Sequence, residues 1–192
     1  MRLHSRKRRA GGRHAGRGVS FAEFLAAVEN PGLRAVAMHW NGARGGKTMP
    51  GWAGIDPAAI AKQLPIVWSW KYDRTADRFT GRLAGEEINA IFGKSMRGAD
   101  MREFFKDWDY DAIFARHRKV VATPCLAHGK GLVFIHAGRY GHGERVILPL
   151  ADDGEHGDGI IGATVYRFLE GGAAGKSKEP SSIGEDVTFY PL

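Results

Sequence analysis

The chain has 192 residues, 43% of them hydrophobic, and a formal net charge of +7 at pH 7. This length suits one domain of about 130 residues with extensions, and the apolar content is enough for a core. No apolar run approaches the roughly 20 residues that a membrane-spanning helix needs, and the single cysteine, Cys125, excludes an internal disulfide and a multi-cysteine metal site. We therefore expect a cytoplasmic protein.

The positive charge belongs to the N-terminal tail. Seven of the 28 basic residues lie between Arg2 and Arg17, ahead of the first acidic residue, Glu23, and the others are as numerous as the 21 acidic residues. Residues 1–18 have no apolar face to bury, so we expect them to be disordered. Binding of nucleic acid through the phosphates is one interpretation of this tail, and a merely solvated extension is the other.

Two helices are predicted in residues 19–43. Ser20 with Glu23 forms a capping box ahead of an amphipathic stretch, and Asn30 with Pro31 starts a second helix. Apolar side chains recur at helical spacing on both, so these stripes have to pack on a sheet or on a second copy of the protein. They are Phe21, Phe24, Leu25, Val28, Leu33, Val36, Ala37 and Trp40.

A β-hairpin follows a further helix. Asp56 and Pro57 are typical of a helix start, and Pro65 is expected to end that helix. Apolar and aromatic side chains occupy every second position in residues 66–72, namely Ile66, Trp68, Trp70 and Tyr72. Residues 78–83 alternate in the same way, with Phe79, Gly81 and Leu83. Period-two alternation with aromatic residues predicts two paired strands.

Two more helices are predicted after the hairpin. Glu86 and Glu87 suit the N-terminus of a short helix, and Gly93 lies where a C-terminal stop belongs. Asp100 with Glu103 forms another possible capping box. Asp109 is expected to cap a longer helix with the sequence YDAIFARHRKVVA.

Three strand candidates close the domain, in residues 131–140, 144–152 and 159–169. Residues 171–184 are rich in Gly, Ala, Lys, Ser and Pro, a composition typical of linkers. The final segment, DVTFYPL, is apolar enough to dock on the body of the protein.

This order of motifs resembles a family of small bacterial proteins that consist of a single PAS domain. The similarity covers roughly residues 33–168, and its specificity lies in the order and spacing of the motifs. The matching motifs are Arg44-Gly45-Gly46 with Met49-Pro50, Asp56-Pro57, Asp73, Arg78-Phe79 with Arg82-Leu83 and Gly85, Gly93-Lys94 with Gly98, and the segments 116–124 and 145–163.

The resemblance implies an α+β fold with a five-stranded antiparallel sheet of order 2-1-5-4-3 and helices over one face. The PAS-like domain would span residues 44–169, after the N-terminal helices of residues 19–43. Residues 170–192 would form a C-terminal linker and tail. Strands and helices in separate runs favour an α+β class in general.

The resemblance also implies a non-enzymatic sensory or interaction module. Such a protein binds a small ligand or a partner, and its output has to pass through another signalling protein. Relatives commonly dimerise through the N-terminal helices, so a homodimer is expected. The sequence names no cofactor, ligand or partner.

No catalytic or metal-binding set is predicted. Four histidines lie in the second half of the chain, but the acids between Asp152 and Asp158 are typical of a glycine-rich hairpin loop. No H-x-x-x-H, G-x-S-x-G or complete phosphate loop occurs. The four histidines are His128, His136, His142 and His156.

A ligand pocket is expected on the helix-covered face of the sheet. Its walls should be apolar, with one or two fixed polar groups. Arg82 is an anion clamp if it points inward and a solvated strand charge if it does not. The candidate pocket residues are Trp68, Trp70, Phe79, Arg82, Phe92, Phe114, His117 and Phe134.

His117 carries a second interpretation. It lies three residues from Phe114 and from Val120, at the edge of the predicted buried stripe of its helix. A haem-binding PAS sensor would use such a helix histidine to ligate iron. The other interpretation is a polar helix residue at the margin of the core.

Removal of residues 1–18 should leave the melting temperature within about a degree or two, because surface segments without contacts contribute little to stability. Thermal unfolding of the full and shortened chains measures this. A drop of many degrees would show that the tail packs on the domain.

Overall fold

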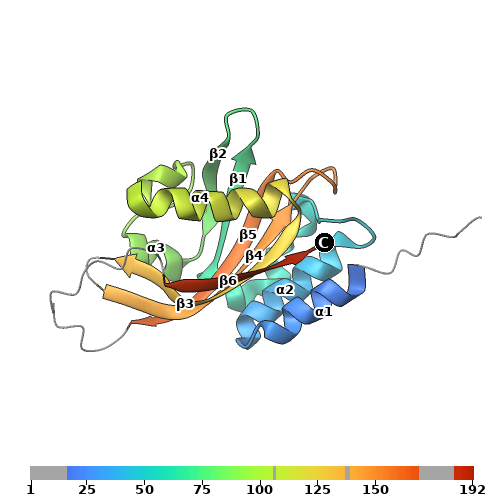
Figure 1. Ribbon diagram of the computed structural model, residues 1–192, viewed down its shortest axis with the longest axis horizontal. Helices are drawn as coiled ribbons and strands as arrows, with labels where there is room; N and C mark the ends of the chain where they lie inside the picture. Colours follow the sequence, from blue (N-terminus) through green and yellow to red (C-terminus); the bar gives the residue numbers. More distant parts are fainter. Residues whose placement is uncertain (1–16, 106, 137–138, 169–183) are drawn as a thin grey trace, which may run out of the picture.

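The computed structural model describes residues 17–105, 107–136, 139–168 and 184–192. Six strands form one antiparallel sheet with the order β2-β1-β5-β4-β3-β6 (Figure 1). Helices cover both faces of this sheet. Within the described part of the chain, no helix combines the length and the apolar character that a membrane crossing needs.

Two helices open the described chain, α1 (Arg17–Ala27) and α2 (Pro31–Arg44). Asn30 caps α2 as predicted, because its side-chain oxygen accepts hydrogen bonds from the backbone N–H groups of Gly32 and Leu33. The expected start at Ser20 is wrong, since α1 already begins at Arg17. Residues 17–18 are therefore helical, and residues 1–16 of the predicted tail lie outside the described residues.

The predicted hairpin is present as β1 (Val67–Asp73) and β2 (Arg78–Ala84). It follows two 3₁₀ helices, η1 (Trp52–Gly54) and η2 (Pro57–Ile66). The helix predicted after Asp56 is thus a 3₁₀ helix, and Pro65 lies inside it instead of ending it.

Three helical elements lie between the hairpin and the remaining strands: α3 (Glu86–Phe92), η3 (Met101–Glu103) and α4 (Asp107–Ala122). Gly93 ends α3 in the left-handed conformation with φ of 66°, as glycine does at helix C-termini. Asp100 and Glu103 form the predicted capping box on η3. The predicted cap at Asp109 is wrong, because α4 begins two residues earlier.

The last four strands are β3 (Cys125–His136), β4 (Arg139–Leu150), β5 (Gly159–Phe168) and β6 (Glu185–Pro191). The expectation of five strands is wrong, because β6 pairs antiparallel with β3 from Cys125↔Pro191 to Gly131↔Glu185. A bare β3 edge would expose unpaired backbone groups, and β6 covers it. Residues 169–183 of the predicted linker lie outside the described residues.

The front face of the sheet packs against α3 and α4. Trp68, Trp70 and Tyr72 of β1 belong to this core, whereas Val67 belongs to the core on the back face. Trp68 and Trp70 therefore share one face, as the alternation predicts. Ser69 is also buried, because the back face is covered as well.

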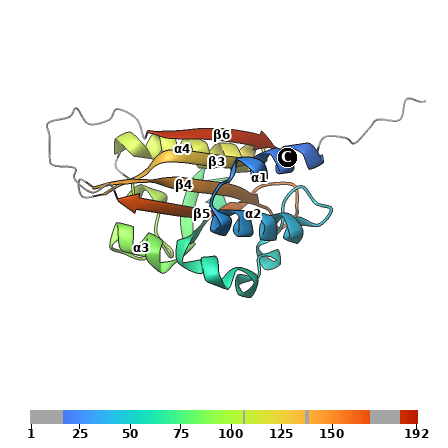
Figure 2. The ribbon, with the colours of Figure 1, turned by 90° about the horizontal axis from the view of Figure 1, so that it is seen from below.

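The back face packs against α1, α2 and η2. Phe24 and Trp40 are fully buried here, and the Trp40 indole donates to the carbonyl of Pro149 at 2.7 Å. Figure 2 shows β4 between α4 and α2. The apolar stripes of the N-terminal helices thus pack on the sheet of the same chain and do not need a second copy to cover them. The homodimer stays a prediction without this argument.

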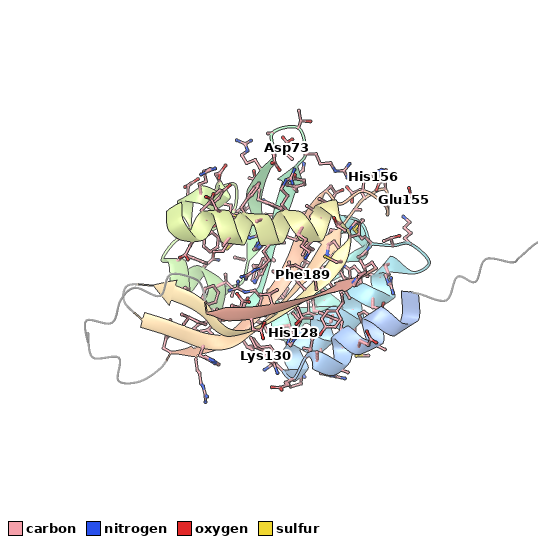
Figure 3. All side chains as sticks on the ribbon, viewed as in Figure 1. Asp73, His128, Lys130, Glu155, His156 and Phe189 are labelled. Atoms are coloured by element: carbon pink, nitrogen blue, oxygen red, sulfur yellow. The ribbon has the colours of Figure 1, made fainter. Side chains whose placement is uncertain are left out.

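A buried carboxylate fixes the α1–α2 junction to the sheet. Glu144 of β4 accepts the backbone N–H groups of Glu29 and Asn30 at 2.7 and 2.8 Å. Nε2 of His128, labelled on β3 in Figure 3, lies 2.7 Å from the same carboxylate. Burial raises the pKa of Glu144, but these hydrogen bonds outweigh burial and lower the pKa overall.

Replacing Trp70 with Ala should lower the free energy of unfolding by about 3–5 kcal/mol, as large aromatic deletions in a core do. Trp70 is only 1% exposed, so the deletion leaves a cavity in the front core. Urea unfolding measures the change. The control Leu83→Ala, at a side chain of β2 that is 45% exposed, should change stability by less than about 0.5 kcal/mol. A Trp70→Ala cost as small as the control's would contradict the assigned register.

Candidate functional site

A small cavity lies between the front face of the sheet and the helical layer of α3 and α4. The sheet contributes Trp68, Trp70, Phe134 and Arg145, and the helical layer contributes Ile88, Phe92, Met96, Phe105 and His117. Its volume is about 20 Å³, which holds about one water molecule. The walls are apolar except for His117 and Arg145.

The structure brings five of the eight predicted pocket residues to this cavity. Trp68, Trp70, Phe92, His117 and Phe134 line it. Phe79 and Phe114 do not line the cavity but pack next to His117, which does. The Phe79 ring lies 5.7 Å from the Phe114 ring and 5.9 Å from the His117 ring.

Arg82 does not belong to the cavity, so its assignment to the pocket is wrong. Phe79 and Gly81 of β2 are buried, and Arg82 is exposed where the β1–β2 register shifts, since Trp70 pairs with Gly81 but Ser69 pairs with Leu83. Its guanidinium lies 4.2 Å from the centre of the Trp52 ring, a cation–π contact. The Trp52 indole is itself held by Asp158 at 2.8 Å.

Arg145 is the polar group that sequence reasoning missed. Its side chain is 7% exposed. Nε donates to the Thr164 hydroxyl at 3.2 Å, and another nitrogen donates to the Val133 carbonyl at 2.5 Å. Val133 lies at a break in the β3–β4 register, which leaves its carbonyl available for this bond. The one available signal was a charge inside the otherwise apolar stretch RVILPL.

A buried ion-pair triad adjoins the cavity. Glu185 of β6 lies 2.5 Å from Arg116 of α4 and 3.4 Å from Arg145 of β4. A Cβ at Gly129 would come within 2.1 Å of the Glu185 carboxylate, so glycine at this strand position makes room for it. Burial lowers the pKa of Arg145, Glu185 partly counteracts this, and the guanidinium stays protonated at physiological pH.

His117 is neutral inside the core. Nδ1 lies 2.6 Å from the Ile113 carbonyl, which accepts hydrogen bonds only, so Nδ1 carries the proton and Nε2 is an acceptor. Burial is the main cause that lowers the pKa of His117 to about 3; the charges of Arg116 and Arg145 act in the same direction, and the hydrogen bond to Ile113 acts against them. The side chain is part of the core and not at its margin.

Sites outside the cavity offer less chemistry. No three His, Cys, Asp or Glu groups in the described ranges come together to hold a metal ion. His156 pairs with Asp153 in an exposed turn, and hydrogen bonds from His156 and Glu155 lower the pKa of Asp153. Burial raises the pKa of the Cys125 thiol to about 11, which keeps it protonated and unreactive.

A protein-family model described as a PAS domain matches residues 28–165. The match contains every residue that lines the cavity, but neither Glu185 nor the rest of β6. No curated protein and no solved structure matches the chain.

His117 should make the protein less stable in acid. The folded protein keeps His117 neutral down to about pH 3, whereas the unfolded chain takes up a proton near pH 6.5. Between these two pH values the unfolded state binds more protons than the folded state. The contribution of His117 to the free energy of unfolding is therefore complete above the unfolded pKa and falls by about 1.4 kcal/mol per pH unit below it. Between pH 7.5 and pH 5.0, the free energy of unfolding measured with urea should fall by about 2 kcal/mol less for His117→Gln than for the natural chain. Equal losses in the two proteins would refute the neutral buried histidine.

Proposed function

Because this chain belongs to the PAS domain family, whose members are in general sensory or interaction modules, we propose that it is a non-enzymatic sensor of a small molecule. The molecule binds in the cavity between the front face of the sheet and the helical layer of α3 and α4. The signal then passes to another protein through changed association.

The observation that carries this proposal is the composition of the cavity wall. Ligand sites in proteins are mostly apolar and contain a few fixed polar groups that orient the ligand. Here aromatic rings from the sheet and the helices supply the apolar part. Arg145 and the acceptor nitrogen of His117 supply the polar part, and tertiary contacts hold both.

The small size of the cavity supports a population shift as the mechanism. A ligand larger than a water molecule has to separate the helical layer from the sheet. Phe92 and Phe105 are only half-buried, so these two rings are the ones that can move outward at low cost. A ligand stabilises the arrangement in which α3 and the segment around Phe105 have shifted, and a partner protein recognises that arrangement.

Two other interpretations receive less support. A haem ligated by His117 would use the Nε2 lone pair, but it would require a much larger separation of the helical layer from the sheet than a small ligand does. Nucleic-acid binding would depend on the basic tail of residues 1–18, of which residues 1–16 lie outside the described residues. It predicts salt-dependent affinity that is lost on deletion of residues 1–18. Homodimerisation stays a prediction that light scattering on the intact protein tests.

A filled cavity should abolish ligand binding. Ile88→Phe places a ring in the space that the ligand needs, and overpacking of this kind costs about 1–3 kcal/mol without unfolding a stable domain. Mass spectrometry under non-denaturing conditions should detect a small molecule on the natural chain, purified from its own cells, and none on Ile88→Phe. The control Leu83→Phe adds the same ring on the exposed side of β2 and should retain the molecule. Equal retention by both variants would place the binding site elsewhere.

A further inference from the structure

The buried triad beside the cavity has one positive charge in excess. Arg116 and Arg145 surround a single carboxylate, that of Glu185, and the three side chains are 10%, 7% and 1% exposed. Among the described residues, Glu185 is the one carboxylate paired with either arginine. A buried charge without a counter-charge is costly, so this arrangement favours a second anion.

Glu185 holds the two arginines unequally. Its distance to Arg116 is 2.5 Å, a short charge-assisted contact, whereas its distance to Arg145 is 3.4 Å, beyond the usual range for a hydrogen bond. The guanidinium of Arg145 has five N–H groups. Thr164 and Val133 accept from two of them and Glu185 lies at long range from a third, so two have no partner among the described residues and can donate to another acceptor.

The cavity is where such an anion has access to Arg145. Arg145 forms part of the cavity wall together with neutral His117, which supplies no negative charge. The Phe134 ring lies 5.1 Å from the guanidinium, and the remaining wall is apolar. A planar guanidinium pairs with a carboxylate through two parallel hydrogen bonds, so the best-fitting anion is a carboxylate with an apolar body.

We infer that the cavity takes a monocarboxylate with an apolar body, and that the ligand carboxylate competes with Glu185 for Arg145. This inference rests on the proposed ligand-binding function and names the class of ligand. It also assigns a role to β6, whose Glu185 carboxylate competes with the ligand for Arg145.

The competition links the ligand to β6. Glu185 is the first residue of β6, and β6 contacts α4 through Glu185 with Arg116 and through Phe189 with Lys119 at 3.7 Å. A ligand that takes over Arg145 leaves Glu185 with one arginine instead of two. Ligand binding and docking of this end of β6 therefore oppose each other, and the opposition is reciprocal.

The test uses two pairs of probes that differ in charge but hardly in shape: phenylacetate with phenylacetamide, and hexanoate with hexanamide. Calorimetric titration of the full chain should show binding of at least one carboxylate and at least about tenfold weaker binding of its amide, because the amide carries no charge for Arg145. Glu185→Gln removes the competitor and should tighten carboxylate binding at least about fivefold. The matched control Asp186→Asn removes the neighbouring, exposed carboxylate of the same strand and should leave the affinity unchanged.

The outcomes separate this inference from the proposed function. Equal affinity for acid and amide would leave a ligand cavity but overturn the carboxylate class. If none of the four probes binds, the inference is also overturned. The proposed function is tested separately, by the mass spectrometry of the molecule that co-purifies with the protein. Unchanged or weaker binding to folded Glu185→Gln would overturn the competition.

A measurement on the natural chain covers the case in which Glu185→Gln does not fold. Hydrogen exchange of the backbone amides of residues 185–188 should become faster when the bound carboxylate is present, because their anchor is weakened. Slower or unchanged exchange of these amides at a saturating carboxylate concentration would overturn the competition.

Discussion

The buried guanidinium of Arg145 on β4 connects three other strands of the sheet. A guanidinium inside a core depends on hydrogen-bond acceptors of the protein, because little solvent reaches it. Its partners come from three neighbouring elements: the Val133 carbonyl of β3, the Thr164 hydroxyl of β5 and the Glu185 carboxylate of β6. The break in the β3–β4 register, the glycine at position 129 and the sixth strand all serve these contacts.

The two faces of the sheet differ in how firmly they are held. On the back face, Trp40 donates to Pro149, and Glu144 binds the α1–α2 junction through two backbone N–H groups. The front face contains the cavity, half-buried aromatic rings and a neutral histidine. Conformational change in response to a ligand is therefore expected in the front layer, while the back layer keeps the sheet in place.

The extension beyond the PAS domain match contributes to the chemistry of the domain. The match ends at residue 165, and Glu185 follows it in sequence but lies inside the front core. Phe189 of the same strand packs against α4 through Lys119 (Figure 3). The C-terminal strand is thus an edge strand that also brings a negative charge to Arg145 in the cavity wall and to Arg116 beside it.

The sequence by itself determined the local elements and most of the apolar wall. Period-two alternation identified the hairpin of β1 and β2 and placed Trp68 and Trp70 on one face, and cap residues such as Asn30 and Gly93 marked helix ends. Only the tertiary structure decided that Arg145 points into the core, that Arg82 points out, and that a sixth strand completes the sheet. Local periodicity records which side chains share a face, whereas the burial of a charge depends on partners that lie far away in sequence, such as Glu185, forty residues after Arg145.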